Sequence, residues 1–256
     1  MITFENSPVQ IEAPAGTFNL LANSSSISIS NPRRETKRFG TAGFHSQVLD
    51  GPMTAQLSVS YYMTDADSGV RGLFTGDGIQ LFNANVGPYR LYSGVASSMS
   101  MSIDPYSVVS CTLDIAFYNG YDQGGSTSTI TAPGDVIHGG ASDVSTDLLW
   151  TNDIISVNYS MNQGISPVYP LGGLAPTGYT REGGTISVDL EGTGLGSILD
   201  FTGVCEGYTT GNINLTGVCE GTVGGGIPFS GYVTDPSITV APNEEIVGSL
   251  SVAGIL

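Results

Sequence analysis

Residues suited to acid–base or metal chemistry are few in this chain, and none stands in a catalytic spacing. The two histidines, His45 and His138, lack the nearby serine or cysteine pattern of a nucleophilic triad. Residues 65–69 begin like a calcium-binding loop, but Gly76 stands where that loop needs a bidentate acid. Residues 192–196 are glycine-rich without the G-x-G-x-x-G spacing of a dinucleotide-binding turn. Because nothing pairs two carboxylates as in a glycosidase, the residue types predict no enzyme, no metal and no cofactor.

The composition predicts a turn-rich, strongly acidic β protein. Of the 256 residues, 40% are hydrophobic and only 12% are charged, and 36 are glycine, which is unfavourable inside helices. The net charge of −16 disfavours nucleic acid as a tightly held ligand, because phosphate binding needs lysine and arginine. The first residues lack the basic start and apolar core of a signal peptide, no run is apolar over membrane-spanning length, and three cysteines make no disulfide framework. These features predict a cytoplasmic origin and no membrane partner.

An internal repeat organises the chain. Residues 92–116 return without a gap at 229–253, with a constant offset of 137. Shorter matches precede this block in the same order: 11–14 with 130–133, 27–30 with 155–158, and 57–60 with 186–189. The order of these blocks predicts a tandem duplication.

Each block alternates apolar and polar residues, which is the period of a half-buried strand with one wet face. We therefore predict an all-β protein of two tandem antiparallel β-sandwich domains. The first domain spans residues 1–122, a linker rich in Gly, Ser and Thr spans 123–129, and the second domain spans 130–256. Residues 65–74 and 195–201 stand at equivalent places, and each has the pattern of one short helix.

Four of the seven basic residues gather in one stretch, directly after the strand predicted at 27–30. They are Arg33, Arg34, Lys37 and Arg38. Such a cluster is commonly a solvated loop, but in so acidic a chain it is typical of one half of a complementary contact. Its partner is predicted to be an acidic surface on another copy, or nucleic acid. The corresponding loop of the second half, residues 159–176, has no basic residue.

The arrangement resembles the tail tube proteins of long-tailed bacteriophages. The shared features are a Ser-rich strand pair, a long loop between its strands, a short central helix and a closing segment like residues 88–94 (PYRLYSG). The resemblance covers most of the chain, once in each half. It implies tail-tube-like sandwiches that contribute strands to a closed inner barrel, six to a ring, with rings stacked into a tube through which DNA leaves the capsid. Some members carry two tandem sandwiches and close the ring as a trimer, and the duplication here implies the same.

The resemblance also implies partners and a location. The chain is expected to self-assemble in the host cytoplasm into a virion tail, and to contact the tape measure protein, the tail terminator and baseplate or sheath proteins. Viral DNA is expected to pass without specific binding, because a wall of Ser, Thr and Asp is wet and repels phosphates. The candidates for this wall are Ser58, Ser60, Thr112, Asp114, Ser187, Asp189, Ser249 and Ser251. The four residues of the basic cluster are the candidates for contact between rings.

Two other classes of protein remain open. One is a different phage tail, baseplate or capsid-decoration protein built on the same sandwich. The other is a carbohydrate-binding β-sandwich, which calls for a secretion signal and an exposed aromatic platform. Trp150 is the one tryptophan of the chain.

Overall fold

The computed structural model describes residues 2–5, 9–14, 16–36, 46–64, 70, 72–75, 79–124, 136–139, 143–146, 154–193, 208–214, 227–239 and 247–255. The described chain is nearly all β, as predicted, and its one helix is the single turn α1 (Gly72–Thr75). That turn lies at the end of the first predicted helix. The second predicted helix, at 195–201, lies outside the described residues, as do residues 65–69 and 130–133.

The strands of the first half are β1 (Ile2–Glu5), β2 (Val9–Ala13), β3 (Gly16–Ser30), β4 (Arg33–Thr36), β5 (Ser46–Leu49), β6 (Thr54–Tyr62), β7 (Phe82–Val86), β8 (Tyr89–Ile103), β9 (Ser110–Phe117) and β10 (Tyr121–Gln123). Those of the second half are β11 (Asp143–Thr146), β12 (Ile154–Val168), β13 (Gly178–Thr193), β14 (Tyr208–Asn214), β15 (Ile227–Thr239) and β16 (Val247–Ile255).

Six strands of the first half close into a barrel. Their order is β8–β7–β2–β3–β6–β9, and β9 pairs back onto β8 to close it. Strands β6 and β9 bury alternate residues, as their sequence pattern predicts. Aliphatic and aromatic side chains fill the interior, among them Ile11, Leu57, Phe82, Leu113 and Phe117. Because β9 pairs back onto β8, most of the edges of these six strands are hydrogen-bonded to another strand.

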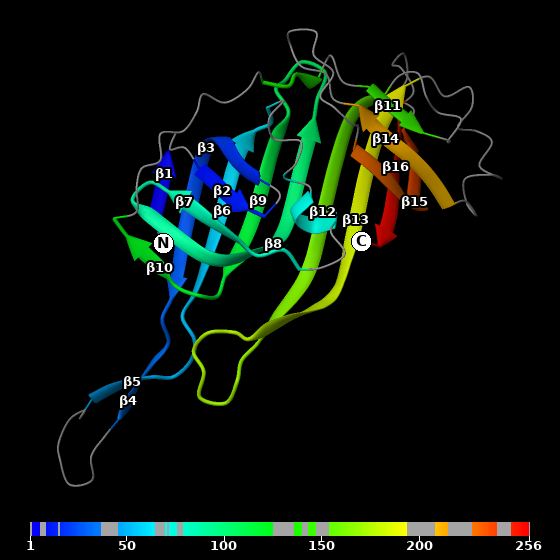
Figure 1. Ribbon diagram of the computed structural model, residues 1–256. Coiled ribbons are helices and arrows are strands. Elements are labelled where there is room, and N and C mark those ends of the chain that lie inside the picture. Colours follow the sequence, from blue (N-terminus) through cyan, green and yellow to red (C-terminus); the bar gives the residue numbers. More distant parts are fainter. Residues whose placement is uncertain are drawn as a thin grey trace.

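The second half continues the same sheet. Residues 98–102 of β8 pair with β9 on one edge and with β12 on the other. The sheet then runs β12–β13–β16–β15–β14–β11, so that β9, β8, β12 and β13 lie side by side (Figure 1). The two halves are thus joined by main-chain hydrogen bonds of β8 to β12.

The strand pairing repeats between the halves. The first half has the order β3–β6–β9–β8, and the second has β12–β13–β16–β15. The pair Ser100–Thr112 of β8 and β9 corresponds to Ser237–Ser249 of β15 and β16, at the predicted offset of 137. Each pair also carries a register shift at nearly the same place, between Ala96 and Ser98 in β8 and between Thr234 and Ser237 in β15. The 137-residue repeat is therefore a repeated strand pair.

The other two offsets differ from those read off the sequence. Ala55 pairs with Phe117 and Ile186 with Gly254, so β6 corresponds to β13 at an offset of 131 instead of 129. Ile29 pairs with Ala55 and Met161 with Ile186, so β3 corresponds to β12 at 132 instead of 128. Both corrections are even numbers, because alternating Ser-Ile runs look alike every two residues while an odd slip would turn the apolar face outward.

Strand β8 bends where it passes from one side of the barrel to the other. Ser93 has φ 54°, and its N–H donates to Asn83 Oδ1 at 3.3 Å. At Gly94 a Cβ atom would lie 2.4 Å from Cε1 of Phe117, whose ring packs edge-on against Phe82. The absence of a side chain at Gly94 therefore lets the buried Phe117 ring close the barrel.

Two hairpins project from the same end of the sheet (Figure 1). One is β4–β5, which carries the start of the basic cluster. The other is the far end of β12–β13, whose turn at residues 169–177 holds the fully exposed Leu171. The long loop predicted between the strands of each half is thus a projecting hairpin in both.

Most of the predicted linker at residues 123–129 lies outside the described residues, as does the predicted start of the second domain at residue 130, because residues 125–135 are not among them. Residues 136–139 pair with the first half through the bridges Thr64–Val136 and Val108–His138. Within the described residues, no helix has the length and apolar character needed to cross a membrane.

Candidate functional site: the polar face of the long sheet

All eight residues predicted for a lumen wall lie on one face of the long sheet, which we call the polar face. Directly opposite residues of an antiparallel ladder project to the same side of the sheet. The ladder places together Ser58–Asp114 and Ser60–Thr112 between β6 and β9, and Asp189–Ser251, with Ser187 and Ser249 in the adjoining rows, between β13 and β16. The face is therefore a single surface shared by both halves.

An unbroken row of small hydroxyl side chains crosses the junction of the halves. It runs Ser60–Thr112–Ser100–Ser160–Ser187 through β6, β9, β8, β12 and β13. A shallow hollow of about 240 Å³ lies over this row and is lined mainly by Ser, Thr, Asn and Asp residues of β8, β9, β12 and β13, together with Met101 and Tyr159. Such a surface offers hydrogen bonds to water and lacks an apolar recess for a ligand.

The acids on the polar face are held by neighbouring hydroxyl groups. Ser98 Oγ donates to Asp114 Oδ2 at 2.6 Å, and Ser251 Oγ donates to Asp189 Oδ1. The negative charges are therefore fixed in place on the strands.

No lysine or arginine lies on the described part of the polar face. Glu191 adds a third acid there and accepts a hydrogen bond from Ser156 Oγ at 3.1 Å. The basic residues of the described chain lie elsewhere: Arg33 and Arg34 on the β4–β5 hairpin, Arg90 on the far side of the barrel, and Arg181, which donates to the Phe74 carbonyl at 3.2 Å. The electrostatic field over the polar face is therefore negative.

The opposite face of the same strands is apolar and buried. Tyr159 and Met161 of β12 and Val188 and Leu190 of β13 are all almost fully buried. They join the barrel interior in one hydrophobic cluster. This burial fixes which face of each strand is left for solvent, because a strand's side chains alternate.

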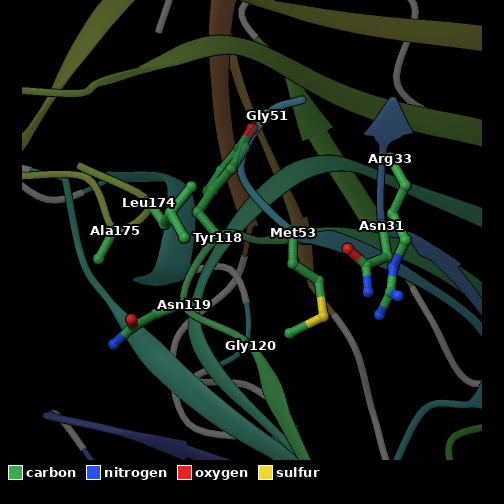
Figure 2. A pocket seen from close by; sticks show the side chains of 9 residues that line it. All are labelled: Asn31, Arg33, Gly51, Met53, Tyr118, Asn119, Gly120, Leu174 and Ala175. Carbon is green, nitrogen blue, oxygen red and sulfur yellow. The ribbon is translucent and has the colours of Figure 1, made fainter. Parts of the chain in front are cut away.

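The basic cluster begins on the β4–β5 hairpin. Arg33 and Arg34 are exposed and have no ion pair within the described residues, while Lys37 and Arg38 lie outside them. Arg33 stands at the rim of a hollow of about 400 Å³ between the hairpin base and the turn of β12–β13 (Figure 2). Met53 and Tyr118 face Leu174 and Ala175 across this hollow. Among the described residues that line it, the hollow has no acid, histidine or cysteine.

Three tyrosines gather below this hollow. The Tyr118 and Tyr179 rings lie 5.8 Å apart, and Tyr169 belongs to the same group. Burial raises the pKa of all three phenols, and the nearby phenols raise the pKa of Tyr169 and Tyr179 further. The group therefore packs the second hairpin against the first half in its neutral form.

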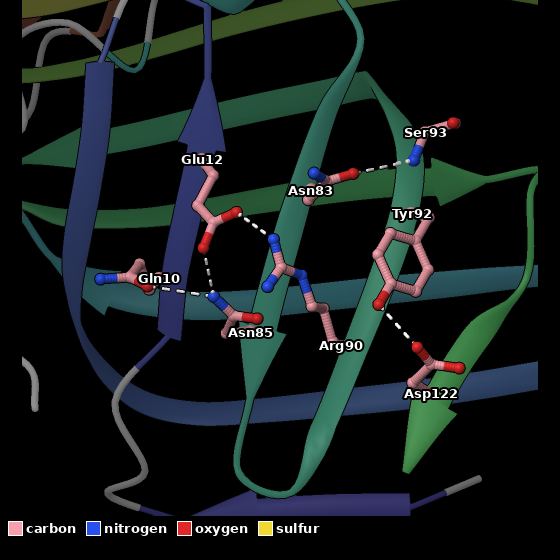
Figure 3. A network of polar contacts seen from close by, with 8 residues as sticks. All are labelled: Gln10, Glu12, Asn83, Asn85, Arg90, Tyr92, Ser93 and Asp122. Carbon is pink, nitrogen blue, oxygen red and sulfur yellow. Dashed lines mark hydrogen bonds and ion pairs between the residues drawn. The ribbon is translucent and has the colours of Figure 1, made fainter. Parts of the chain in front are cut away.

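A polar network covers the outer side of the barrel away from the polar face (Figure 3). Arg90 Nη2 donates to Glu12 Oε2 at 2.7 Å, and Asn85 Nδ2 donates to Glu12 Oε1 at 2.8 Å. Tyr92 Oη donates to Asp122 at 2.7 Å, and this hydrogen bond raises the pKa of the Tyr92 phenol. The network ties β2, β7, β8 and β10 together and leaves no catalytic arrangement among these residues.

Sequence reasoning missed the centre of the polar face. Ser98, Ser100 and Ser102 of β8 pair with Asn162, Ser160 and Asn158 of β12. Their alternation with Met and Tyr was visible, but the pairing of β8 with β12 joins residues about 60 positions apart and has no local signal.

The chain's sequence matches no protein-family model and no curated protein.

Proposed function

We propose that this chain is the subunit of a phage tail tube, assembled as rings of three chains that imitate a sixfold ring around a DNA-conducting lumen. In this proposal the two halves are tandem tail-tube-like sandwiches, and the polar face lines the lumen. The observation that carries the proposal is the pairing of β8 with β12. It joins one repeat to the next through main-chain hydrogen bonds, and the same junction repeated between chains would close a ring.

The charge of the polar face fits a conduit. Asp114, Asp189 and Glu191 repel phosphates, and the hydroxyl rows keep water at the wall. Duplex DNA binds tightly only where lysine and arginine displace its counterions. A surface of this kind lets a duplex pass without holding it.

The expected size of the ring also fits. Four strands per repeat in six repeats make about 24 strands, and at about 4.8 Å per strand their circumference is about 115 Å. The diameter between backbones is then about 37 Å, and strand tilt only widens it. Side chains on both walls still leave room for a duplex about 20 Å across.

The projecting hairpins suit contacts between stacked rings. They leave the sheet at one end, with Arg33 and Arg34 on one and the exposed Leu171 on the other. In the assembled tube they would meet the neighbouring ring, whose surface is acidic like the rest of the chain.

Electron microscopy of the purified protein tests the proposal. We expect rings or tubes with threefold symmetry, a sixfold outline and a lumen wider than a DNA duplex. A protein that stays monomeric at high concentration and binds oligosaccharides would overturn it in favour of a carbohydrate-binding sandwich. Small closed oligomers that do not stack into tubes would favour a capsid-decoration protein.

A further inference from the structure

The structure points to a specific role for β1 that rests on the proposed function. We propose that β1 is a removable cap on the edge of β3, and that the β15 strand of a second copy of this chain replaces it when the ring closes. Three strand edges bear on this role: the edge of β12, which β8 covers, the edge of β3, which β1 covers, and the edge of β15.

The junction inside one chain supplies the template. On β12, residues 157–162 pair antiparallel with residues 103–98 of β8. Because β12 corresponds to β3 at an offset of 132, the matching edge of β3 is residues 25–30. Because β8 corresponds to β15 at an offset of 137, the matching segment of β15 is residues 235–239, and residue 240 lies outside the described residues.

Both matching edges are open or lightly covered. Strand β14 pairs with residues 227–232 of β15 and extends no further along that edge. Residues 233–239 of β15 therefore have no described partner on that edge. On β3, β1 pairs with residues 24–27, and residues 28–30 have no described partner beside it. The two edges lie at opposite sides of the molecule, so that copies can join head to tail (Figure 1).

The repeated junction brings like residues together. The template places Ser28 opposite Ser237 and Ile27 opposite Ile238. Ser237 is itself paired with Ser249 of the polar face, so the row of polar positions would continue from one chain into the next. The apolar positions would likewise continue, since Ile27 is fully buried on the other side of β3.

β1 stands where the incoming strand must pair. It runs antiparallel to β3, as β8 does to β12. Its pairs Phe4–Ser25, Thr3–Ser26 and Ile2–Ile27 occupy three of the template positions on β3. It is a four-residue strand with one neighbour, and both Ile2 and Thr3 are exposed. A short edge strand protects a sheet from unwanted pairing and is easily displaced. Only chains whose β1 is released can accept the next copy, so the apparent affinity of one copy for the next rises with the fraction of chains whose β1 is released.

A reversible disulfide bond that holds β1 on β3 tests whether β1 must be released before the ring can form. We substitute Thr3→Cys together with Ser26→Cys, which are directly paired, and form the disulfide under oxidation. We expect the oxidised protein to assemble at least about tenfold more slowly than its reduced form. A variant lacking residues 2–7 is expected to assemble faster than the wild type by a similar factor. Each single-cysteine variant, oxidised in the same way, is the matched control, and circular dichroism checks that the deletion variant is folded.

A second pair tests the register between chains. Ser28→Cys with Ser237→Cys is expected to give covalent dimers and trimers, and Ser28→Cys with Thr234→Cys to give none. The equivalent pair inside one chain, Ser100→Cys with Ser160→Cys, is expected to cross-link without a change in size. In each case, peptide mass spectrometry identifies which two cysteines are bridged and so distinguishes the introduced cysteines from the native ones.

The outcomes separate the cap from the proposed function. If the wild type forms rings and neither the disulfide bond on β1 nor the deletion changes their rate, the cap is wrong and the tube proposal stands. If the Thr234 pair cross-links in place of the Ser237 pair, the junction between chains differs from the template and this inference fails. If neither the wild type nor the deletion variant forms rings and no bridge joins two chains, both proposals fail.

Discussion

At the scale of single residues, the fold depends on a few positions where side chains must be small or neutral. Gly94 makes space for the Phe117 ring inside the barrel, and Ser93 takes a left-handed conformation beside it. The polar face depends in turn on hydroxyl groups that hold Asp114 and Asp189. Each of these positions allows a test with one substitution.

Gly94→Ala is expected to destabilise the fold by about 1–3 kcal/mol, because its Cβ would overlap a ring that is fully buried and has nowhere to move. Urea unfolding followed by circular dichroism measures this. Gly178→Ala is the control, since nothing lies within 4 Å of its added Cβ. Equal unfolding midpoints for the two variants would contradict the packing described at Gly94.

The tyrosine group predicts a loss of stability in alkali. Tyr118, Tyr169 and Tyr179 have pKa values raised in the folded chain, so their neutral forms stabilise it below the ordinary phenol pKa. This contribution is lost as the pH rises through the raised values. Phenolate absorbance is expected to show tyrosines titrating late, and Tyr118→Phe and Tyr179→Phe are each expected to remove one late phase. A single titration of all tyrosines at the ordinary pKa is the contrary result.

At the scale of elements, the two corresponding sets of strands are alike, whereas the two projecting hairpins differ. The strands of each half repeat in order and register, whereas the hairpins differ: β4–β5 carries arginines, and the β12–β13 turn carries leucines. Equivalent strands suit equivalent places in a ring. Unlike hairpins suit different neighbours along a tube.

Arg33→Glu with Arg34→Glu is expected to leave single rings intact and to shorten tubes strongly. Both side chains are exposed, so the free energy of unfolding should change by no more than about 0.5 kcal/mol. Electron microscopy measures the tube length. Arg33→Lys with Arg34→Lys keeps the charge and is expected to restore long tubes. Tubes of normal length from the glutamate variant would remove the basic cluster from the stacking contact.

At the scale of the whole molecule, one curved sheet carries a polar face across both halves. The barrel of the first half supports this sheet from behind, and the β8–β12 junction makes it continuous. Part of the chain's formal charge of −16 lies on this face, at Asp114, Asp189 and Glu191. In the proposed tube this face is the inner wall, where its negative charge would act on the passing DNA.

Asp189→Lys with Ser249→Lys is expected to make assembled particles bind duplex DNA, which the wild type should not do. Both positions are exposed on the polar face, and a trimer would gain six lysines on its inner wall. Binding should weaken steeply with salt, because it depends on counterion release. Thr17→Lys with Asp122→Lys makes the same change in charge on other exposed strands, β3 and β10, and serves as the control. Equal DNA binding by both variants would mean that the polar face is not the inner wall.

The all-β class, the repeat of 137 and the polar side of each strand were predictable from the sequence. Alternation at Ile186, Val188 and Leu190 determines which face is buried, because a strand's side chains point to opposite sides with a period of two. The same period explains the errors in the other two offsets. Runs of Ser and Ile match themselves at every even shift, so the register of β3 and β12 stays undetermined until partner strands are known.

The tertiary structure alone decided which polar rows adjoin. Ser60 and Ser187 belong to one row only because β8 pairs with β12, and Thr3 covers Ser26 only because β1 returns to β3. Both pairings are non-local main-chain contacts that any β-forming residues can make, so the residue types do not specify them. The sequence by itself determined two sets of strands, each with one polar side. Long-range pairing of β8 with β12 joined the two sets into one continuous sheet, whose outer edges include those of β3 and β15.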